Sequence, residues 1–576
     1  MKILQESLKC RKGRKFEVGL NMERDYTFLD SAPRGMFFDK KEYDNKPLLT
    51  FEEARKSLPD PRIEGRKEWN DCYWYAVKIL FGNTHKPKEG SGYVSNFVDA
   101  AFNDDIFLWD TCFMTLFCNL FHHYIPGICS LDNFYCKQFD DGEIPREMVR
   151  DTGKDFLLWV NAYDKPLYSY FHNHYGFRGL KQMTDLSYED MYKPELGRKV
   201  TPNPYLTLDN LNHPILAMAE WQSFVHTGDV ERLQLVWEPL YQYYKAFRHH
   251  VRHANGLYVT DWASMDNSPR NKYLGFGVDP TCEMVLFAGN LLDMMEVLKA
   301  HGMPVKDGDQ REAFLRKDRE ETIEAAQKYM WNEEDGFFYD VTFEEKQSGM
   351  KTAAAFWALI SGTADKEQQK RLAAWLDDEK TFKRPHRVPV LAADEEGYDP
   401  MGGYWSGSVW APTNAMIVLG LEKCGFRDLA RDIAMNHLEV LNKVFQDTGT
   451  IWENYPPEYL TSGNSDHPDM VGWSGLAPVL YFVQYGVGLC VPEGADCLEW
   501  TLNEDYLAEG SVGCDRYWFR GKQADLDARI RDGILVITVK TEDEFPLKIR
   551  FRGKEYDYTV SGRSGQQSVI TYEIFL

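Results

Sequence analysis

The sequence predicts an all-α fold, an (α/α)6 barrel, followed by a small antiparallel β module. Three observations predict it. Apolar residues recur at helical spacing in segment after segment from about residue 66 to 487. Several of these segments end at a glycine suited to the left-handed turn that follows a helix. From about residue 488 the segments become β-rich and are separated by glycine turns. We therefore expect an N-terminal arm over 1–65, a helical catalytic domain over 66–487 and a β module over 488–576.

The expected helices follow one another with short breaks. In chain order they are 68–80, 109–124, 131–139, 155–170, 213–226, 230–253, 283–301, 311–331, 353–360, 366–376, 411–423, 427–445 and 471–487. Gly302 and Gly425 mark two of the stops, and Pro412 suits the first turn of its helix. The expected strands are 533–540, 546–552 and 569–575.

A weak repeat favours a closed ring over an open solenoid. Three helices end in a glycine turn and a short aromatic extended piece, at Asn255–Tyr258, Asp335–Tyr339 and Thr448–Trp452. Helix pairs that end alike are typical of stacked helical hairpins. Many of the helices are apolar around most of their circumference, which indicates an inner layer wrapped by an outer one. About twelve helices in six pairs would close such a ring.

Composition narrows the classes of partner and ligand that the protein can have. Net charge is −23, which argues against nucleic acid or an anionic membrane as partner. Aromatic residues make up 14% of the chain, and such side chains stack on the apolar faces of sugar rings as well as filling cores. The 11 cysteines have no metal-ligand spacing, and the N-terminus has no apolar signal core. We expect reduced thiols, a cytoplasmic location, no metal, no cofactor and a small-molecule partner.

The richest stretch of potential chemistry runs from Gly256 to Arg270. It follows a long amphipathic helix and places Asp266 on a turn with Asn267, where a carboxylate can act as a positioned acid. The same residues also fit an Asx-turn, in which the aspartate only bonds its own backbone. A second acid, Glu453, follows an equivalent helix–glycine–aromatic turn. Two acids in equivalent places of a repeat would face each other across the mouth of a ring, as glycoside hydrolysis requires.

Other stretches carry groups that could bind a sugar. Asp110 follows Trp109 at the start of an apolar helix, and Arg146 lies in an acidic turn. The aromatic candidates are Trp262, Trp405, Trp410, Tyr455 and Trp473. Each position also has a plain structural interpretation: a helix cap for Asp110, a solvated ion pair for Arg146, core packing for the tryptophans.

Five of these motifs together resemble glycoside hydrolase family 63, the family of processing α-glucosidases and bacterial mannosylglycerate or glucosylglycerate hydrolases. They keep the family's order over roughly residues 100–485. The matching stretches are Trp109-Asp-Thr111, Gly142-Glu-Ile-Pro-Arg-Glu147, Ala263-Ser-Met-Asp-Asn-Ser-Pro-Arg270, Trp405-Ser-Gly-Ser-Val-Trp-Ala-Pro-Thr-Asn414 and Glu453-Asn-Tyr455. Ala263-Ser264 replaces the family's Ser-Gly, a departure that bears on the backbone position of the acid. Ser406 replaces the family's Arg, which argues against the processing-glucosidase substrate.

The resemblance implies an inverting exo-acting hydrolase of an α-linked glucoside or a related small glycoside. Asp266 would be its general acid and Glu453 its general base. The residues implied to line the sugar site are Trp109, Asp110, Arg146, Trp262, Asn267, Arg270, Trp405, Trp410, Tyr455 and Trp473. On physical grounds we expect Asp266 in a partly apolar pocket, plausibly beside Trp262, and Glu453 in a more solvated place. The segment 171–203 is where we expect the distal group of the substrate to be selected.

Two alternatives remain open. A sugar epimerase on the same ring would use histidine as acid and base, and the sequence offers His213, His226, His249, His250 and His253, although no supporting residues group with any of them in the sequence. A non-catalytic carbohydrate-binding protein would retain the aromatic cleft without turnover.

Overall fold

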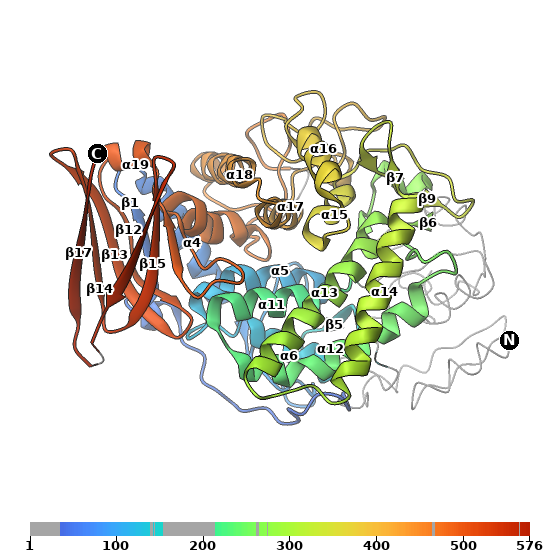
Figure 1. The fold of residues 1–576 in the computed structure, drawn as a ribbon, viewed down its shortest axis with the longest axis horizontal. Helices are drawn as coiled ribbons and strands as arrows, with labels where there is room; N and C mark the ends of the chain where they lie inside the picture. Colours follow the sequence, from blue (N-terminus) through green and yellow to red (C-terminus); the bar gives the residue numbers. More distant parts are fainter. Residues whose placement is uncertain are drawn as a thin grey trace.

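The computed structural model describes residues 35–138, 142, 144–153, 213–260, 264–273, 275–463, 467–563 and 565–576. A helical body and a β module lie side by side, with α4 between them (Figure 1). The predicted helical region and C-terminal β module are both present, and the strand pairs of the module are antiparallel except β11 (Leu498–Thr501) with β15 (Glu544–Phe551), which is parallel. The helix predicted over 155–170 lies outside the described residues.

Six largely buried helices follow one another in a closed circuit, and we call them the inner helices. They are α5 (Leu108–Cys118), α11 (Leu216–Thr227), α13 (Val278–Ala300), α15 (Trp357–Ser361), α17 (Ala411–Cys424) and the π-helix η8 (Ala477–Val487). Each packs on the next, and η8 with the short η7 (Ser474–Leu476) returns to α5. Their apolar residues lie on all sides because helices or turns cover them all round.

Longer amphipathic helices cover this circuit from outside. They are α4 (Lys67–Gly82), α12 (Val230–Val251), α14 (Gly308–Tyr329), α16 (Lys366–Leu376) and α18 (Arg427–Thr448). Helix α14 shows the pattern, since only Leu315, Asp318, Thr322, Ala325 and Ala326 are buried along it. These positions repeat every three or four residues, so one stripe faces the inner helices and the rest faces solvent.

The predicted glycine stops are confirmed. Gly302 follows α13 with φ of +74°, and Gly425 ends α17 with φ of +87°. Residues with a side chain rarely adopt this conformation, so glycine ends the helix there at low energetic cost. The predicted helix 131–139 is shorter than expected: only the 3-10 turn η2 (Ile128–Leu131) and α6 (Asp132–Tyr135) form.

Short elements connect the helices. The helical turns are α3 (Phe51–Ala54), η1 (Asn119–Phe121), η4 (Pro269–Tyr273), η5 (Ala353–Phe356) and η6 (Tyr404–Ser406). The short strands pair as four hairpin-like ladders: β2 (Thr84–His85) with β3 (Phe97–Val98), β4 (Asp105–Phe107) with β5 (Glu147–Val149), β6 (Gly275–Phe276) with β9 (Val341–Thr342), and β7 (Trp331–Asn332) with β8 (Phe337–Phe338).

The β module contains two sheets and the short helix α19 (Glu504–Ala508). The larger sheet has the order β1 (Asp60–Ile63), β12 (Val512–Phe519), β13 (Lys522–Arg531), β14 (Ile534–Thr541) and β17 (Ser568–Phe575). The smaller has β10 (Leu489–Cys490), β11 (Leu498–Thr501), β15 (Glu544–Phe551) and β16 (Lys554–Ser561). Alternate residues of β14 and β15 are buried between the sheets, as the sequence pattern indicates.

One strand of the module comes from the N-terminal arm. Strand β1 pairs antiparallel with β12, and Ile63 lies opposite Val512. Arg62 donates to Asp515 and Asp527 on the neighbouring strands at 2.7 and 3.1 Å. The module is therefore built from both ends of the chain, beyond the boundary expected near residue 488.

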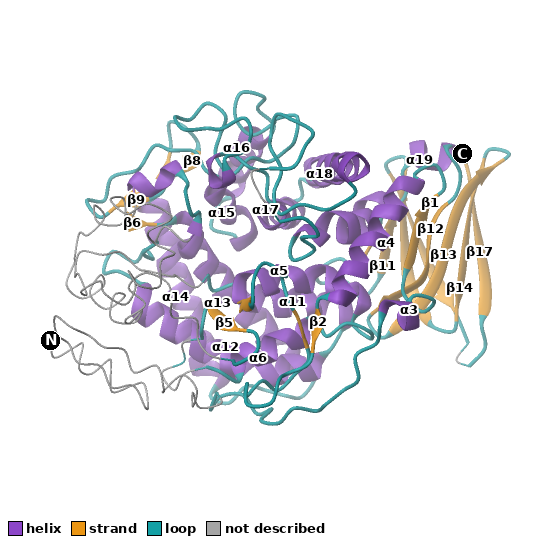
Figure 2. Cartoon of the chain, turned by 180° about the vertical axis from the view of Figure 1, so that it is seen from behind, coloured by secondary structure: helices purple, strands orange, loops and turns teal. Residues whose placement is uncertain are grey.

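The two ends of the inner helices have different surroundings. Candidate site residues occupy N-terminal ends: Asp110 lies in the first turn of α5, Trp410 precedes α17 and Trp473 precedes η7. Residues near the C-terminal ends of α11, α13, α17 and η8 line a cleft together with residues of the β module, which lies beside the helical body (Figure 2). Within the described ranges, none of the helices has the length and apolar character needed to cross a membrane.

Candidate active site

The turn that carries Asp266 is anchored by Arg270 to the body of the protein. Arg270 is 2% exposed and donates both terminal nitrogens to Asp279 in the first turn of α13, at 2.8 Å each. Its Nε lies 3.0 Å from Asp340. The planar guanidinium fits a carboxylate in this two-bond geometry, so the arginine fixes the turn in position.

The charges of this buried group compensate one another. Burial alone would raise the pKa of Asp279, but the charge and hydrogen bonds of Arg270 lower it below its ordinary value. Burial raises the pKa of Asp340 despite the same arginine. The two acids raise the pKa of Arg270 although its burial acts the other way. The arginine is therefore a fixed cation that holds two acids together.

Local hydrogen bonds fix the backbone of Asp266 itself. Asn271 donates its Nδ2 to the carbonyl oxygens of Met265 and Asp266, at 3.2 and 2.5 Å. The amide of Ser268 donates to the Met265 carbonyl at 2.9 Å. Asp266 remains partly exposed. These bonds fix the main chain that carries the carboxyl group.

Asn267 joins this turn to a second one around η6. Its Nδ2 donates to the Gly403 carbonyl at 3.0 Å, and its Oδ1 accepts from the Trp405 amide at 2.9 Å. The chain turns sharply at Gly402, which has φ of +96°, and a Cβ there would lie 2.3 Å from Ser408 Oγ. Glycine is therefore needed for the 402–406 turn to reach Asn267.

The same turn also reaches Glu453. The Tyr404 hydroxyl donates to Glu453 Oε1 at 3.1 Å, and the Trp473 indole donates to the Glu453 carbonyl at 2.9 Å. Glu453 is 1% exposed. The expectation that Glu453 would be the more solvated of the two acids is wrong, because an aromatic cluster encloses it while Asp266 stays partly exposed.

That aromatic cluster assembles four of the predicted tryptophans. Trp405 stacks on Trp410 with ring centroids 4.5 Å apart, and Trp410 contacts Trp473 at 5.7 Å. Trp109 lies 6.2 Å from Trp473 and 6.5 Å from Trp405. Trp109 is the most open of the four, whereas Trp410 is fully buried. Trp109 and Trp405 are thus better placed for a sugar face than Trp410.

Burial separates predicted contact residues from supporting ones. Other residues of the protein surround Trp410, Tyr455 and Arg270, which are each at most 2% exposed. Tyr455 accepts a hydrogen bond from the Trp452 amide through its hydroxyl, at 3.0 Å. In this structure these three side chains are buried and support the groups around the site, and their contact with a substrate stays a prediction. Asn267 is exposed, but its amide is engaged by the 402–406 turn.

Asp110 and Arg146 lie on the same side of the site as Glu453. Strands β4 and β5 pair beside the start of α5, and the Leu108 amide donates to the Arg146 carbonyl at 2.9 Å. Burial raises the pKa of Asp110 to about 7; the charge of Arg146 lowers it and the charge of Glu453 raises it. Asp110 is therefore a buried carboxyl that changes charge close to neutral pH.

This shift predicts how stability depends on pH. The pKa of Asp110 in the folded protein exceeds the ordinary 3.8, so folding favours the neutral carboxyl. The resulting contribution to the free energy of unfolding is complete below about pH 4 and is lost as pH rises through about 7. At 1.36 kcal/mol per pKa unit, the loss reaches up to about 4 kcal/mol. We expect Asp110→Asn to unfold in urea like the starting protein at pH 4.5 and at higher urea concentration at pH 8.

Asp309, an exposed acid in the first turn of α14, supplies the control for this measurement. Asp309→Asn should follow the starting protein at both pH values. Stability curves of Asp110→Asn and the starting protein that stay parallel from pH 4.5 to 8 would contradict the assignment.

The sequence prediction missed His213 and Glu283. His213 Nδ1 lies 2.7 Å from Glu283 Oε2, and its ring centroid lies 6.5 Å from that of Trp109. The expectation that none of the histidines has a supporting partner is wrong for His213. A signal was present, since Glu283 follows Asp279 by one turn on an otherwise apolar helix. Buried acids on such a helix require partners.

Three predicted features lie outside the described residues. They are Trp262, the neighbouring Asp261, and the segment 171–203 expected to select the distal group of the substrate.

Comparison with known proteins gives a domain match and several relatives. The model of the mannosylglycerate hydrolase MGH1-like glycoside hydrolase domain matches residues 200–465. This range includes both predicted catalytic acids.

An uncharacterized protein of Borreliella burgdorferi is 25% identical over 308 residues, which are 51% of this chain and 63% of that protein. A probable trehalase of Eremothecium gossypii is 32% identical over 149 residues, 24% of this chain and 19% of the trehalase. The chain thus spans less than two thirds of the length of both relatives.

Solved structures share the fold. The family 63 mannosylglycerate hydrolase of Thermus thermophilus, in complex with Tris and D-glycerate, aligns with a TM-score of 0.51 and 17% identity over 72% of this chain and 100% of that chain. The complex of that enzyme with glucose aligns with a TM-score of 0.50 and 18% identity, over 70% and 98% of the two chains.

Proposed function

We propose that this chain, a family 63-like six-hairpin glycosidase, hydrolyses an α-glycosidic bond with inversion at the anomeric carbon. We assign Asp266 as the acid that protonates the leaving oxygen and Glu453 as the base that activates water. The substrate is a small α-linked glucoside or related glycoside cleaved from its end. The protein acts in the cytoplasm without metal or cofactor, and its partner is that carbohydrate.

One observation carries the proposal: the 402–406 turn bonds both to Asn267, next to Asp266, and to Glu453. The two acids come from turns that are far apart in the sequence, and one rigid connector sets their relative position. An inverting hydrolase needs such a fixed separation, ~6.5–9.5 Å, so that a water molecule fits between the base and the sugar. A retaining enzyme would hold the two carboxyls ~5–5.5 Å apart.

The surroundings of each acid support its role. Asp266 is partly exposed, so its carboxyl can meet a leaving group that must depart toward solvent. Glu453 is enclosed by aromatic side chains and accepts the Tyr404 hydroxyl, which orients one carboxylate oxygen. When Glu453 takes a proton from water, that water attacks the anomeric carbon while Asp266 gives its proton to the glycosidic oxygen.

We also propose that the closed circuit of inner helices is the inner ring of an (α/α)6 barrel. Helices α4, α12, α14, α16 and α18 supply five partners on the outside. In this arrangement the N-terminal ends of the inner helices form the floor of the sugar site. The N-terminal end of α5 places partial positive charge near Asp110, which favours an acid at this end of the ring.

The substrate panel follows from the relatives and from the site. It contains α-linked glucosides, mannosides and galactosides, including mannosylglycerate and trehalose because relatives carry those names. Proton NMR during the first minutes of cleavage identifies the first-formed anomer. We expect an α-linked substrate to release the β-anomer before mutarotation. The α-anomer as first product would refute inversion, and no cleavage of any member would refute the proposed substrate class.

A sugar epimerase is the second candidate, favoured by the His213–Glu283 pair beside Trp109. It would convert a sugar to an isomer without breaking a glycosidic bond, and the same NMR time course would show this. Tight sugar binding without any turnover, unchanged in Asp266→Ala, would instead indicate a binding protein.

A further inference from the structure

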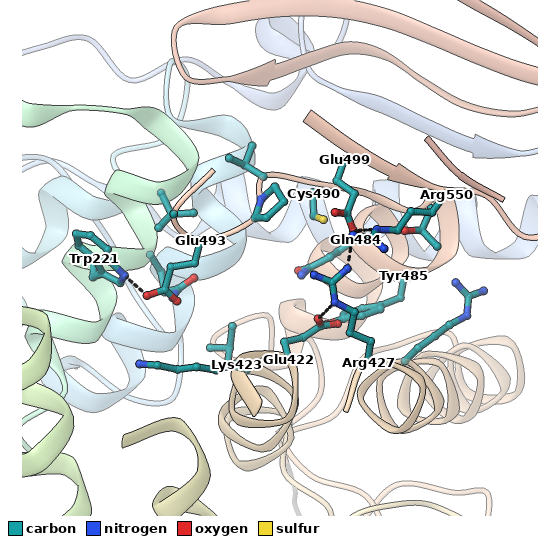
Figure 3. A pocket seen from close by; sticks show the side chains of 18 of the residues that line it. Trp221, Glu422, Lys423, Arg427, Gln484, Tyr485, Cys490, Glu493, Glu499 and Arg550 are labelled. Atoms are coloured by element: carbon teal, nitrogen blue, oxygen red, sulfur yellow. Dashed lines mark hydrogen bonds and ion pairs between the residues drawn. The ribbon is translucent and has the colours of Figure 1, made fainter. Parts of the chain in front are cut away.

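A wide cleft lies at the end of the helical body opposite to the candidate active site. Its volume is about 1310 Å³, and it separates the C-terminal ends of inner helices from the β module (Figure 3). Helices α11, α13, α17 and η8 contribute Val225, Val297, Lys423 and Tyr485 to its wall. The loop after β10, with Val491 and Glu493, forms the other side. The cleft is independent of the catalytic proposal, because none of the site residues described above lines it.

One face of α13 brings polar and apolar groups to this cleft. Leu286, Asn290, Asp293 and Val297 all line it and are three or four residues apart, so they project from the same side of the helix. Asn290 is 2% exposed and its Oδ1 has no hydrogen-bond partner. A buried amide without partners costs free energy unless a ligand or water completes its bonds.

Three charged groups meet across the cleft without neutralising one another directly. Asp293, Lys423 and Glu493 are close enough for their charges to interact. Burial raises the pKa of Asp293, the charge of Lys423 lowers it and the charge of Glu493 raises it. In the described part of the chain, the Lys423 ammonium forms no ion pair within 4.0 Å with either acid. All three line the cleft, so another molecule in it can reach their polar atoms.

Glu493 is held in place on this gap. Its Oε1 accepts the Trp221 indole proton at 2.8 Å, and Lys423 extends toward the same side of the cleft (Figure 3). The charged residues nearer the module are different, because they satisfy one another: Glu499 accepts from Arg427 at 3.1 Å and lies 2.8 Å from Arg550. That second group joins the module to the body, whereas Asp293, Lys423 and Glu493 lie at the α13 side of the cleft.

We propose that this cleft binds a neutral polyhydroxylated molecule, a sugar or polyol, between α13, the end of α17 and the loop after β10. Hydroxyl groups both donate and accept, so one ring can donate to Asp293 and Glu493 and accept from Lys423. The side-chain amide of Asn290 can accept one further hydrogen bond and donate another. Leu286, Val297 and Val225 provide apolar contact for the C–H faces of the ring. Lys423 would repel a simple cation, and the carboxylates of Asp293 and Glu493 would repel a simple anion.

Binding stoichiometry of D-glucose tests the proposal. Equilibrium dialysis with labelled D-glucose, on the full chain carrying Glu453→Gln to prevent turnover, should give two sites. Lys423→Met removes the ammonium and keeps the alkyl stem, and Asp293→Asn keeps the shape of the acid. Each variant should weaken one site roughly 10- to 100-fold, since each removes a charge-assisted hydrogen bond. Thermal unfolding of both variants checks that the fold is retained.

Lys370→Met is the matched control, because Lys370 is an exposed lysine on α16 whose partner Glu367 is also exposed. It should leave both glucose sites intact. A crystal soaked in D-glucose should show a ring in contact with Lys423 and Asp293. Glucose binding of unchanged affinity in both cleft variants, whether at one site or at two, or tighter binding of glycine or methylammonium than of glucose would overturn the proposal. A protein that cleaves nothing but retains the second glucose site would refute the catalytic proposal and leave this one standing.

Discussion

Asp266→Asn and Glu453→Gln should each lower kcat by ~10²–10⁴-fold or more while substrate still binds. Each change keeps the shape of the side chain and removes its ability to give or take a proton. The 402–406 turn makes the pair act as a unit, because Asn267 and Tyr404 tie both acids to one connector. We therefore expect the double variant to lose little more than either single variant.

Glu458 provides the comparison for these kinetics. It lies five residues after Glu453 but is bonded to Arg384 and to the Tyr398 hydroxyl, at 3.0 and 2.8 Å. Glu458→Gln should keep kcat within about threefold of the starting protein, because no role in proton transfer is lost. Near-normal turnover in Asp266→Asn or Glu453→Gln would remove that residue from its role, and a large loss in Glu458→Gln would move the base to that position.

Arg270→Met should lower the free energy of unfolding by about 3–5 kcal/mol. The substitution leaves Asp279 and Asp340 buried without their cation, and each is at most 5% exposed. Urea unfolding followed by tryptophan fluorescence measures the effect. The triple variant Arg270→Met, Asp279→Asn, Asp340→Asn should recover part of the loss, because it no longer buries an uncompensated charge.

Arg384→Met is the control for this stability measurement. Arg384 also pairs with a carboxylate, that of Glu458, but its side chain is 25% exposed. An ion pair of that kind contributes about 0–1 kcal/mol. If the two arginine variants unfold at the same urea concentration, the anchor assigned to Arg270 is not what holds the Asp266 turn.

The sequence predicted the helices well because each one carries its own pattern. Helix α16 has the predicted bounds, and α18 begins at the predicted residue, since caps and apolar stripes are local signals. The two acids could be singled out for the same reason: each follows a glycine turn that ends a helix. What joins them could not be predicted. The bonds of Tyr404 to Glu453 and of Asn267 to Trp405 link positions 49 and 138 residues apart, and no local pattern encodes such pairs.

The burial of Glu453 shows the same limit. Glu453 is buried, and the groups that bond to it, the Tyr404 hydroxyl and the Trp473 indole, come from stretches 49 residues before it and 20 residues after it. His213 and Glu283 form their pair across 70 residues. Composition indicated an aromatic site, but which ring would cover which acid depends on how the inner helices lie beside one another.

The position of β1 has a consequence for the order in which the protein can be built. Arg62 on β1 pairs with Asp515, 453 residues later. At roughly 5–20 residues per second of synthesis, β1 waits on the order of 20–90 seconds for its partner strand to be made. During that time the inner helices can already pack, because the helices that they contact are synthesised before β12. Strand β1 stays unpaired until then. A strand made late therefore captures one made about 450 residues earlier, and this sheet closes only after the helical body has been synthesised.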